Sequence, residues 1–238
     1  MNSLNVLHSA VAIAVATSML VLPAACIVEP APTGTSPSLG GDPDERTGEA
    51  VEAVTSVQLA VTHQTQFATG CASPKNYCCG PTAGNMATAF LHGVAPTAAF
   101  LQKGYQYLGL NSCCGTGTSL AQVTQVAKNV GTALGSGGPY CATFANIKTQ
   151  LQAKHPVAVA VTYNNIGAAR RCGTFNVPHV LLITGYDETL GMWYGEDPYC
   201  TSGGQSWQSM ELRSAAGAQV AAYGCPTGTE AIADFFSL

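Results

Sequence analysis

The sequence predicts an α+β domain, in which an N-terminal helical half packs on a C-terminal antiparallel sheet. Two observations lead to this fold class. Helical spacing of apolar residues dominates from Cys79 to Lys154, whereas alternating and continuous apolar runs dominate from His155 to Asp197. Because the helices precede the strands and do not alternate with them, the order of elements favours α+β over α/β.

Length and composition limit the number of domains. With 238 residues, of which 47% are hydrophobic and 9% charged, the chain can bury one sizeable core. Six of the thirteen acidic residues and one of the nine basic residues lie before position 56, so the remainder is nearly neutral. The remainder has no run of lysine or arginine, which argues against a nucleic-acid partner.

Residues 1–26 are typical of an export signal. Val11–Leu22 is an apolar run of signal-peptide length, and Cys26 resembles the lipidated cysteine of a lipoprotein signal, although Pro23 stands where a leucine is usual and no Lys or Arg precedes the run. We expect a lipoprotein-type signal whose lipid at Cys26 anchors the protein to a membrane, with an ordinary cleaved signal as the alternative. Residues 27–55 predict a flexible acidic linker rich in Pro, Gly and Ser, or alternatively a short propeptide. Residues 56–238 then form the folded domain.

Ten cysteines support export to an oxidising compartment, in the bacterial cell envelope or outside the cell. If Cys26 carries a lipid and Cys79 is a nucleophile, eight remain, and an even number can form four disulfides. The sequence does not determine which cysteines pair. Metal binding is the competing use of so many thiols, but no Cys-x-x-Cys occurs, and we expect neither a metal nor another cofactor.

The first structured segments are one strand and four helices. Ser56–Thr62 alternates apolar and polar residues, as a half-buried strand does. Cys79 opens a helix in which Pro81 suits the first turn, and the apolar spacing continues to Leu91. The same spacing predicts three further helices, at Thr97–Tyr107, Ser119–Val130 and Phe144–Lys154.

After these helices the sequence predicts three neighbouring antiparallel strands. HPVAVAVTY (155–163) alternates its valines on one face, HVLLITGYD (179–187) is a nearly continuous apolar run, and GMWYGED (191–197) follows a short turn. Two segments are expected to close the domain, Gly203–Ser214 and Ala231–Leu238. The second would place Ile232, Phe235 and Phe236 on one side.

The residues that can carry chemistry occupy defined places in this scheme. Cys79 lies at the positive end of a helix, which stabilises a thiolate, and Gly80 would let the backbone approach a substrate closely. His179 opens a strand and can act as the base for the thiol. Asp197 ends the next strand, and a hairpin would bring it beside His179. Asp187 lies too far along the same strand to orient the imidazole.

Four segments carry a resemblance to a known family: YCCGPTAGNMATAF (77–90), HPVAVAVTY (155–163), PHVLLITGYD (178–187) and WYGEDPY (193–199). They resemble the papain-like cysteine peptidases that cleave double-glycine leader peptides of bacteriocins, in particular soluble relatives without a transporter. The resemblance covers most of residues 56–200 and implies the papain-like fold. It also implies the catalytic order Gln, Cys, His and Asp, which gives Gln66, Cys79, His179 and Asp197. The Gln side chain and the Cys79 N–H would stabilise the oxyanion.

The glutamine departs from the family pattern. Gln66 lies farther before Cys79 than the pattern has it, and Gln64 is a second candidate for the oxyanion hole. An inserted loop closed by Cys71 and Cys78 would restore the distance in space.

Two function classes remain. The first is an exported cysteine hydrolase, most simply a peptidase acting through an acyl-enzyme, or an acyltransferase or transpeptidase that shares its first half-reaction. The second is a disulfide-stabilised binding module without turnover. We expect a peptide or protein substrate and a monomeric protein.

Specificity would reside in the loops at 108–118 and 164–178. Within the second loop, Arg170 and Arg171 can meet an acidic group or lie in solvent. The other histidines, His63, His92 and His155, are interpreted as structural or solvent-facing because they lack motif support.

Overall fold

The described part of the chain comprises residues 54–69, 77–109, 117–128, 134–135 and 140–238 of a computed structural model. The signal and linker predicted for residues 1–26 and 27–55 lie outside it, apart from the last two linker residues. Four cysteines also lie outside it, namely Cys26, Cys71, Cys113 and Cys114. No helix within the described residues is both long enough and apolar enough to cross a membrane.

Helices and strands largely follow the predicted order. The helices are α1 (Cys79–Leu91), α2 (Ala98–Tyr107), α3 (Leu120–Val126), α4 (Phe144–Gln152) and α5 (Ser209–Val220). Short 3-10 turns are η2 (Tyr163–Asn165), η3 (Ala168–Arg170) and η4 (Ala221–Tyr223). The strands are β1 (Ser56–Gln58), β2 (Leu134–Gly135), β3 (Tyr140–Ala142), β4 (Val157–Thr162), β5 (Pro178–Asp187), β6 (Met192–Glu196), β7 (Gln205–Gln208) and β8 (Ala231–Ser237).

Side-chain caps explain where three of the predicted helices begin. The hydroxyl of Thr97 accepts from the Phe100 N–H before α2, and Ser119 and Thr143 form capping boxes before α3 and α4. Helix α4 ends two residues before its predicted end, and Lys154 adopts a left-handed conformation with φ 63°. A residue of this conformation terminates a helix, because it turns the next carbonyl away from the axis.

The strands form one sheet in the order β2-β8-β4-β5-β6-β7. Every strand pair among the described residues is antiparallel, which confirms β4, β5 and β6 as neighbours. β1 pairs with residues 185–187 of β5, and β3 pairs with β8. β1 is shorter than predicted because β4 pairs with residues 178–183 on the same edge of β5, which leaves β1 only residues 185–187.

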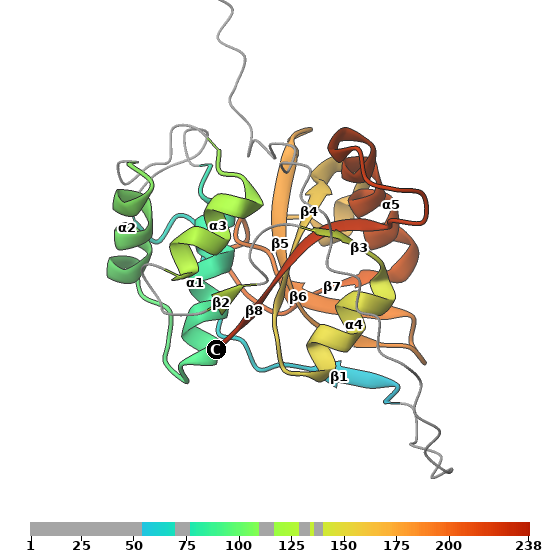
Figure 1. The fold of residues 1–238 in the computed structure, drawn as a ribbon, viewed down its shortest axis with the longest axis horizontal. Coiled ribbons are helices and arrows are strands. Elements are labelled where there is room, and N and C mark those ends of the chain that lie inside the picture. Colours follow the sequence, from blue (N-terminus) through green and yellow to red (C-terminus); the bar gives the residue numbers. More distant parts are fainter. Residues whose placement is uncertain (1–53, 70–76, 110–116, 129–133, 136–139) are drawn as a thin grey trace, which may run out of the picture.

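Alternation along the strands creates two hydrophobic cores, one on each face of the sheet. Val180 and Leu182 of β5 pack with α1 and α3, whereas Leu181 and Ile183 pack with α4 and α5. Figure 1 shows α1, α2 and α3 gathered on one side of the strands and α4 and α5 on the other. The predicted packing of helices on an antiparallel sheet is thus confirmed for α1 to α3, whereas α4, predicted as part of the same helical half, covers the opposite face together with α5.

The C-terminal segment corrects one expectation. Ala231–Ser237 is a strand, so Ile232 and Phe236 face the α1 core, whereas Phe235 packs against the opposite core. Placing all three apolar side chains on one side was wrong, because successive side chains of a strand point to opposite faces.

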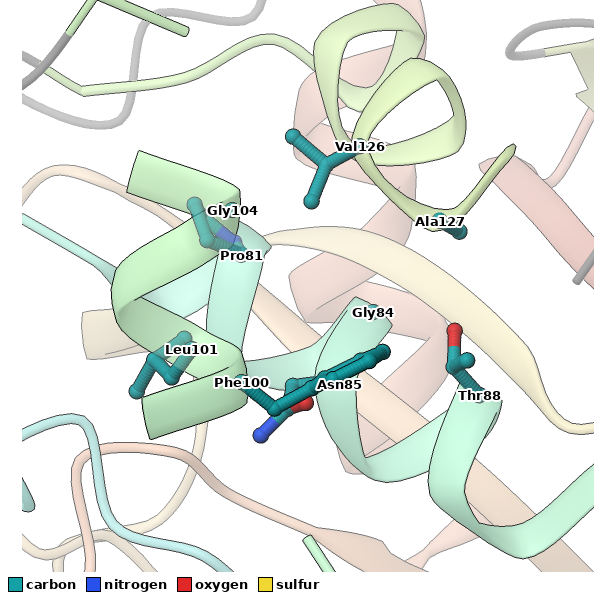
Figure 2. A pocket seen from close by; sticks show the side chains of 9 residues that line it. All are labelled: Pro81, Gly84, Asn85, Thr88, Phe100, Leu101, Gly104, Val126 and Ala127. Carbon is teal, nitrogen blue, oxygen red and sulfur yellow. The ribbon is translucent and has the colours of Figure 1, made fainter. Parts of the chain in front are cut away.

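The three N-terminal helices pack with little space between them. They enclose a gap of about 10 Å³ (Figure 2), whose lining residues are Pro81, Gly84, Asn85, Thr88, Phe100, Leu101, Gly104, Val126 and Ala127. A volume of this size holds about one water molecule. The gap is therefore a packing feature of the helical half and no substrate site.

We expect Gly185→Ala to destabilise the fold, because β1 and β5 pair in close contact at this glycine. A Cβ there would lie 2.3 Å from the carbonyl oxygen of Val57 and 2.9 Å from Cα of Gln58. Backbone atoms must shift to relieve such a contact, so the free energy of unfolding should fall by about 1–3 kcal/mol in urea denaturation.

Gly217→Ala is the matched control. It lies in α5, a Cβ there meets nothing within 4 Å, and alanine favours a helix more than glycine by up to about 1 kcal/mol. The two variants should therefore change stability in opposite directions, and a loss of equal size in both would contradict the packing described for β1.

Candidate active site

Cys79 is the first residue of α1, as predicted. Cys78 at the N-cap position makes no side-chain capping bond, and the first turn contains no acidic residue. The positive end of the helix dipole therefore faces the sulfur without a neighbouring carboxylate in that turn. Cys79 is only 2% exposed and packs in the same core as Val180 and Ala160.

The oxidation state of this cysteine differs from the expectation. Cys78 and Cys79 are both disulfide-bonded, and neither belongs to the two pairs that lie wholly within the described residues, Cys141–Cys225 and Cys172–Cys200. The assumption that Cys79 stays outside the disulfides therefore does not hold in this structure. A thiolate is the nucleophilic form of cysteine, so Cys79 can attack a substrate only after reduction.

Gly80 has a packing role that its sequence context did not predict. The residue is buried, and a Cβ on it would lie 2.5 Å from the hydroxyl of Thr118 and 2.6 Å from Val123. The missing side chain instead lets the start of α1 pack closely on α3 and the residues before it.

His179 and Asp197 are brought together, as predicted. His179 is the second residue of β5, and Asp197 directly follows β6. The Nε2 of His179 donates to Oδ1 of Asp197 at 2.7 Å, and the two side chains are 2% and 0% exposed. The Nδ1 of the ring is then the nitrogen left for proton transfer to a reacting group.

His179 and Asp197 meet although they are not paired with each other in the β5–β6 hairpin. Asp187 pairs with Met192, but the register shifts between Ile183 and Gly185, and Leu182 pairs with Glu196. Continued by one residue from Leu182–Glu196, this register puts Leu181 opposite Asp197, so Asp197 does not lie directly opposite His179 in the ladder. It lies in the turn after β6, where its carbonyl accepts from Cys200 N–H at 3.0 Å, and its side chain reaches back to the imidazole.

Electrostatics keep Asp197 ionised despite its burial. Burial alone would raise its pKa, but the charge of His179 and hydrogen bonds from His179, Tyr163 and the Tyr199 N–H hold the pKa below its usual value. The backbone N–H of Tyr199 donates to Oδ1 at 2.8 Å, and the Tyr163 hydroxyl donates to Oδ2 at 2.5 Å. An ionised acceptor at Nε2 fixes the tautomer of His179.

Tyr163 and Phe175 are site residues that the sequence analysis missed. The ring of Tyr163 lies 4.7 Å from that of His179 and the ring of Phe175 lies 5.4 Å from it, both edge to face. A usable signal was present for Tyr163, since it directly follows β4, whose Val161 pairs with His179. Phe175 belongs to the loop at 164–178, so this loop lies next to the imidazole.

The two glutamines occupy different places. The Gln66 N–H donates to the carbonyl oxygen of Pro198 at 2.7 Å, which puts Gln66 beside the Asp197 turn, and its side chain is 2% exposed. The Gln64 side chain instead accepts from the Asn85 amide in the middle of α1. This placement favours Gln66 over Gln64, and its role in an oxyanion hole stays a prediction. Cys78 is disulfide-bonded, but its predicted partner Cys71 lies outside the described residues.

Arg170 and Arg171 are both engaged within the domain. Arg170 pairs with Glu211 at 3.0 Å, and the guanidinium of Arg171 donates to the side chain of Asn164 at 2.6 Å. Both guanidinium groups are thus held by neighbours in this structure. The other proposed specificity loop, 108–118, lies largely outside the described residues.

One group of three metal-type ligands occurs among the described residues, formed by Cys172, Asp197 and Cys200. Their ligand atoms lie within 4.8 Å of one another. The two sulfurs are bonded to each other, however, and a disulfide sulfur is no thiolate ligand. While this disulfide is intact, the group does not fit a metal ion.

His63 ties the segment after β1 to the end of β6. Its Nδ1 lies 2.9 Å from Oε2 of Glu196, and its Nε2 lies 3.1 Å from the Cys200 carbonyl oxygen. Both partners can only accept, so both bonds form only when the ring carries two protons. Burial alone would lower the pKa of His63, but Glu196, together with the Cys200 carbonyl, raises it above its usual value. His63 therefore has a structural place beside the Asp197 turn.

We expect the stabilisation by His63 to depend on pH. A pKa raised in the folded state gives stabilisation that is fully present below the unfolded value of about 6.5 and is lost as pH rises through the folded pKa. His63→Gln should therefore lower the free energy of unfolding by about 1 kcal/mol below that pH, and by progressively less above it. Urea denaturation of both proteins between about pH 5 and 8 measures this difference.

His155→Gln is the control with the opposite sign, because burial lowers the pKa of His155. The native protein should lose stability relative to this variant as pH falls through about 6.5. If the two variants showed the same pH dependence, the assignment of a protonated His63 would be wrong.

Comparisons with known proteins agree with this geometry. The sequence profile of the Peptidase_C39 like family matches residues 58–224. No curated protein matches the chain. The crystal structure of a C39-like peptidase from Bacillus anthracis is similar with a TM-score of 0.52 and 14% identity, over 77% of this chain and 98% of that one.

Two further solved structures are similar at lower scores. Xylellain, a cysteine protease from Xylella fastidiosa, gives a TM-score of 0.46 at 12% identity, over 76% of this chain and 84% of its own. Digestive procathepsin L 3 of Tenebrio molitor gives 0.45 at 15%, over 77% and 70%. Because the family profile matches well over half of the sequence, the chain belongs to the Peptidase_C39 like family and has the papain-like α+β fold.

Proposed function

We propose that this protein is a cysteine peptidase that becomes active when Cys79 is reduced. Cys79 is the nucleophile, His179 transfers protons, Asp197 orients His179, and Gln66 with the Cys79 N–H binds the oxyanion. The observation that carries the proposal is the buried His179–Asp197 hydrogen bond of 2.7 Å, next to Val180, which shares a core with Cys79 at the start of α1.

The chemistry begins with reduction. An external dithiol supplies two electrons and two protons, which convert the disulfide of Cys79 into two thiols while the dithiol becomes a disulfide. The proposal requires that the released sulfur reach Nδ1 of His179, since Nε2 is held by Asp197. Proton transfer to this nitrogen then gives a thiolate at the positive end of α1.

The thiolate attacks the carbonyl carbon of a peptide bond and forms a tetrahedral oxyanion. When this intermediate collapses, the C–N bond breaks, His179 gives its proton to the leaving amine, and a thioester remains on Cys79. His179 next takes a proton from water, and the water oxygen attacks the thioester carbon. The C–S bond then breaks, which releases the acid and restores the thiolate of Cys79. An amine in place of water would make the product of an acyl transfer, because the first half-reaction is shared.

The second candidate is a binding module without turnover. The disulfide of Cys79 favours it specifically, because the sulfur is then neither ionisable nor exposed. The two candidates differ in what reduction does: a latent peptidase gains activity, whereas a binding module gains none.

We also propose that the protein is exported and meets peptide or protein substrates as a monomer. Support comes from the Cys141–Cys225 and Cys172–Cys200 disulfides, which are typical of proteins in oxidising compartments. The signal peptide at 1–26, the linker at 27–55 and the lipid at Cys26 remain part of this proposal.

We expect hydrolysis of a synthetic peptide mixture, read by mass spectrometry, to appear as dithiothreitol is added to the oxidised full-length protein. Cys79→Ala should abolish it, lowering the rate by more than about 10³-fold, as loss of a nucleophile does. In the reduced protein, iodoacetamide should label Cys79 rapidly at neutral pH. The labelling should slow at acid pH and in His179→Ala, since the thiolate depends on the imidazole.

Cys78→Ala is the matched control, because it removes the neighbouring disulfide-bonded cysteine and leaves Cys79 in place. It should keep both the peptide hydrolysis and the rapid labelling. The peptidase proposal fails, and the binding module is favoured, if the reduced protein cleaves no peptide and His179→Ala leaves the labelling rate at Cys79 unchanged.

A further inference from the structure

The Tyr163 hydroxyl is one of three donors that form hydrogen bonds to the Asp197 carboxylate. Oδ1 of Asp197 is engaged by His179 and by the Tyr199 N–H, whereas Oδ2 accepts from the Tyr163 hydroxyl at 2.5 Å. Tyr163 is fully buried and Asp197 is 0% exposed, so water does not replace this donor from bulk solvent. The hydroxyl is therefore the group that replaces water as the hydrogen-bond donor to Oδ2.

The Tyr163 hydroxyl is itself held in place. It accepts from the Cys172 N–H at 2.8 Å, and the ring stacks on Phe175 at 4.3 Å. Cys172 is bonded to Cys200, whose N–H donates to the Asp197 carbonyl oxygen at 3.0 Å. The disulfide thus links the backbone that holds Tyr163 to the backbone that holds Asp197.

We propose that Tyr163 is a positioning residue for catalysis, which acts through Asp197 and is held by the Cys172–Cys200 disulfide. The inference rests on the proposed peptidase function. With Oδ2 bound to the hydroxyl, the carboxylate cannot rotate its Oδ1 away from Nε2 of His179. Without the hydroxyl, a buried carboxylate oxygen loses its donor, which disfavours the ionised form that orients the imidazole.

A purely structural role for Tyr163 is the reading that the test must exclude. Tyr186 offers a matched control, because its hydroxyl also has one donor and one acceptor partner. It accepts from the Gln152 amide at 2.7 Å and donates to the Val54 carbonyl oxygen at 3.0 Å, at the far end of β5. Tyr163→Phe and Tyr186→Phe therefore remove the same group from buried sites, and only the first touches Asp197.

The first measurement needs no activity. In the oxidised full-length protein, the proton shared by His179 and Asp197 is followed by NMR as a downfield resonance while the pH is lowered. The Tyr163 hydrogen bond helps to lower the pKa of Asp197. Tyr163→Phe should therefore move the acid transition of this signal to higher pH, and Tyr186→Phe should leave it where it is in the native protein.

The second measurement uses a cleaved peptide and protein in which Cys79 is reduced while the Cys172–Cys200 disulfide stays intact, which mass spectrometry of the alkylated protein verifies. Tyr163→Phe should lower kcat about 10-fold, which matches the net worth of one hydrogen bond, with KM unchanged. The acid limb of its kcat/KM profile should move to higher pH. If Tyr163→Phe fails to fold, a double variant with Cys172→Ser and Cys200→Ser takes its place, because it keeps the tyrosine and releases the backbone that holds it. The double variant should also move the NMR acid transition and the acid limb of kcat/KM to higher pH.

The outcomes separate the two proposals. Identical NMR transitions and identical kcat in Tyr163→Phe and Tyr186→Phe would overturn the positioning role, even in an active peptidase. A shifted NMR transition in Tyr163→Phe, in a protein that cleaves no peptide after reduction, would uphold the placement of Asp197 by Tyr163 and refute the peptidase function.

Discussion

The buried hydrogen bond between His179 and Asp197 is the interaction on which the rest of the site depends. Removing an ionised carboxylate from water costs several kcal/mol unless other groups replace its hydration. Here the imidazole, a backbone N–H and a tyrosine hydroxyl provide three hydrogen bonds to it. The bulge in β5, the turn after β6 and the Cys172–Cys200 disulfide place these donors around the carboxylate.

The position of Cys79 at the positive end of α1 is the second feature on which the site depends, and it has two consequences. The helix dipole stabilises a thiolate, which suits a nucleophile. A sulfur that leaves readily as a thiolate also makes its disulfide easier to cleave by thiol exchange. The same local structure thus fits both the oxidised form seen here and a reduced form that reacts. In an oxidising compartment, this chemistry would link activity to the local supply of reductant.

Two residues have packing roles in the structure that their sequence context did not indicate. Gly80 looked like a place of substrate approach, but its missing side chain accommodates Thr118 and Val123. His63 had no motif, yet it binds Glu196 and the Cys200 carbonyl, directly beside the Asp197 turn. In both cases the decisive neighbours lie far along the chain, so no spacing in the sequence could have revealed them.

Periodicity and motif spacing by themselves determined the α+β class, the start of α1 at Cys79, the neighbouring strands β4 to β6, and the placing of His179 and Asp197 at the same end of the β5–β6 hairpin. These features follow from local backbone preference and from hairpin geometry, which act over a few residues. Only the tertiary structure decided the bulge that shifts the hairpin register, the hydrogen bond from Tyr163 to Asp197, the different places of Gln66 and Gln64, and the oxidation of Cys79. The physical reason is that hydrogen bonds to a buried carboxylate and the pairing of cysteines depend on which distant segments pack together, and many pairings are compatible with one sequence pattern.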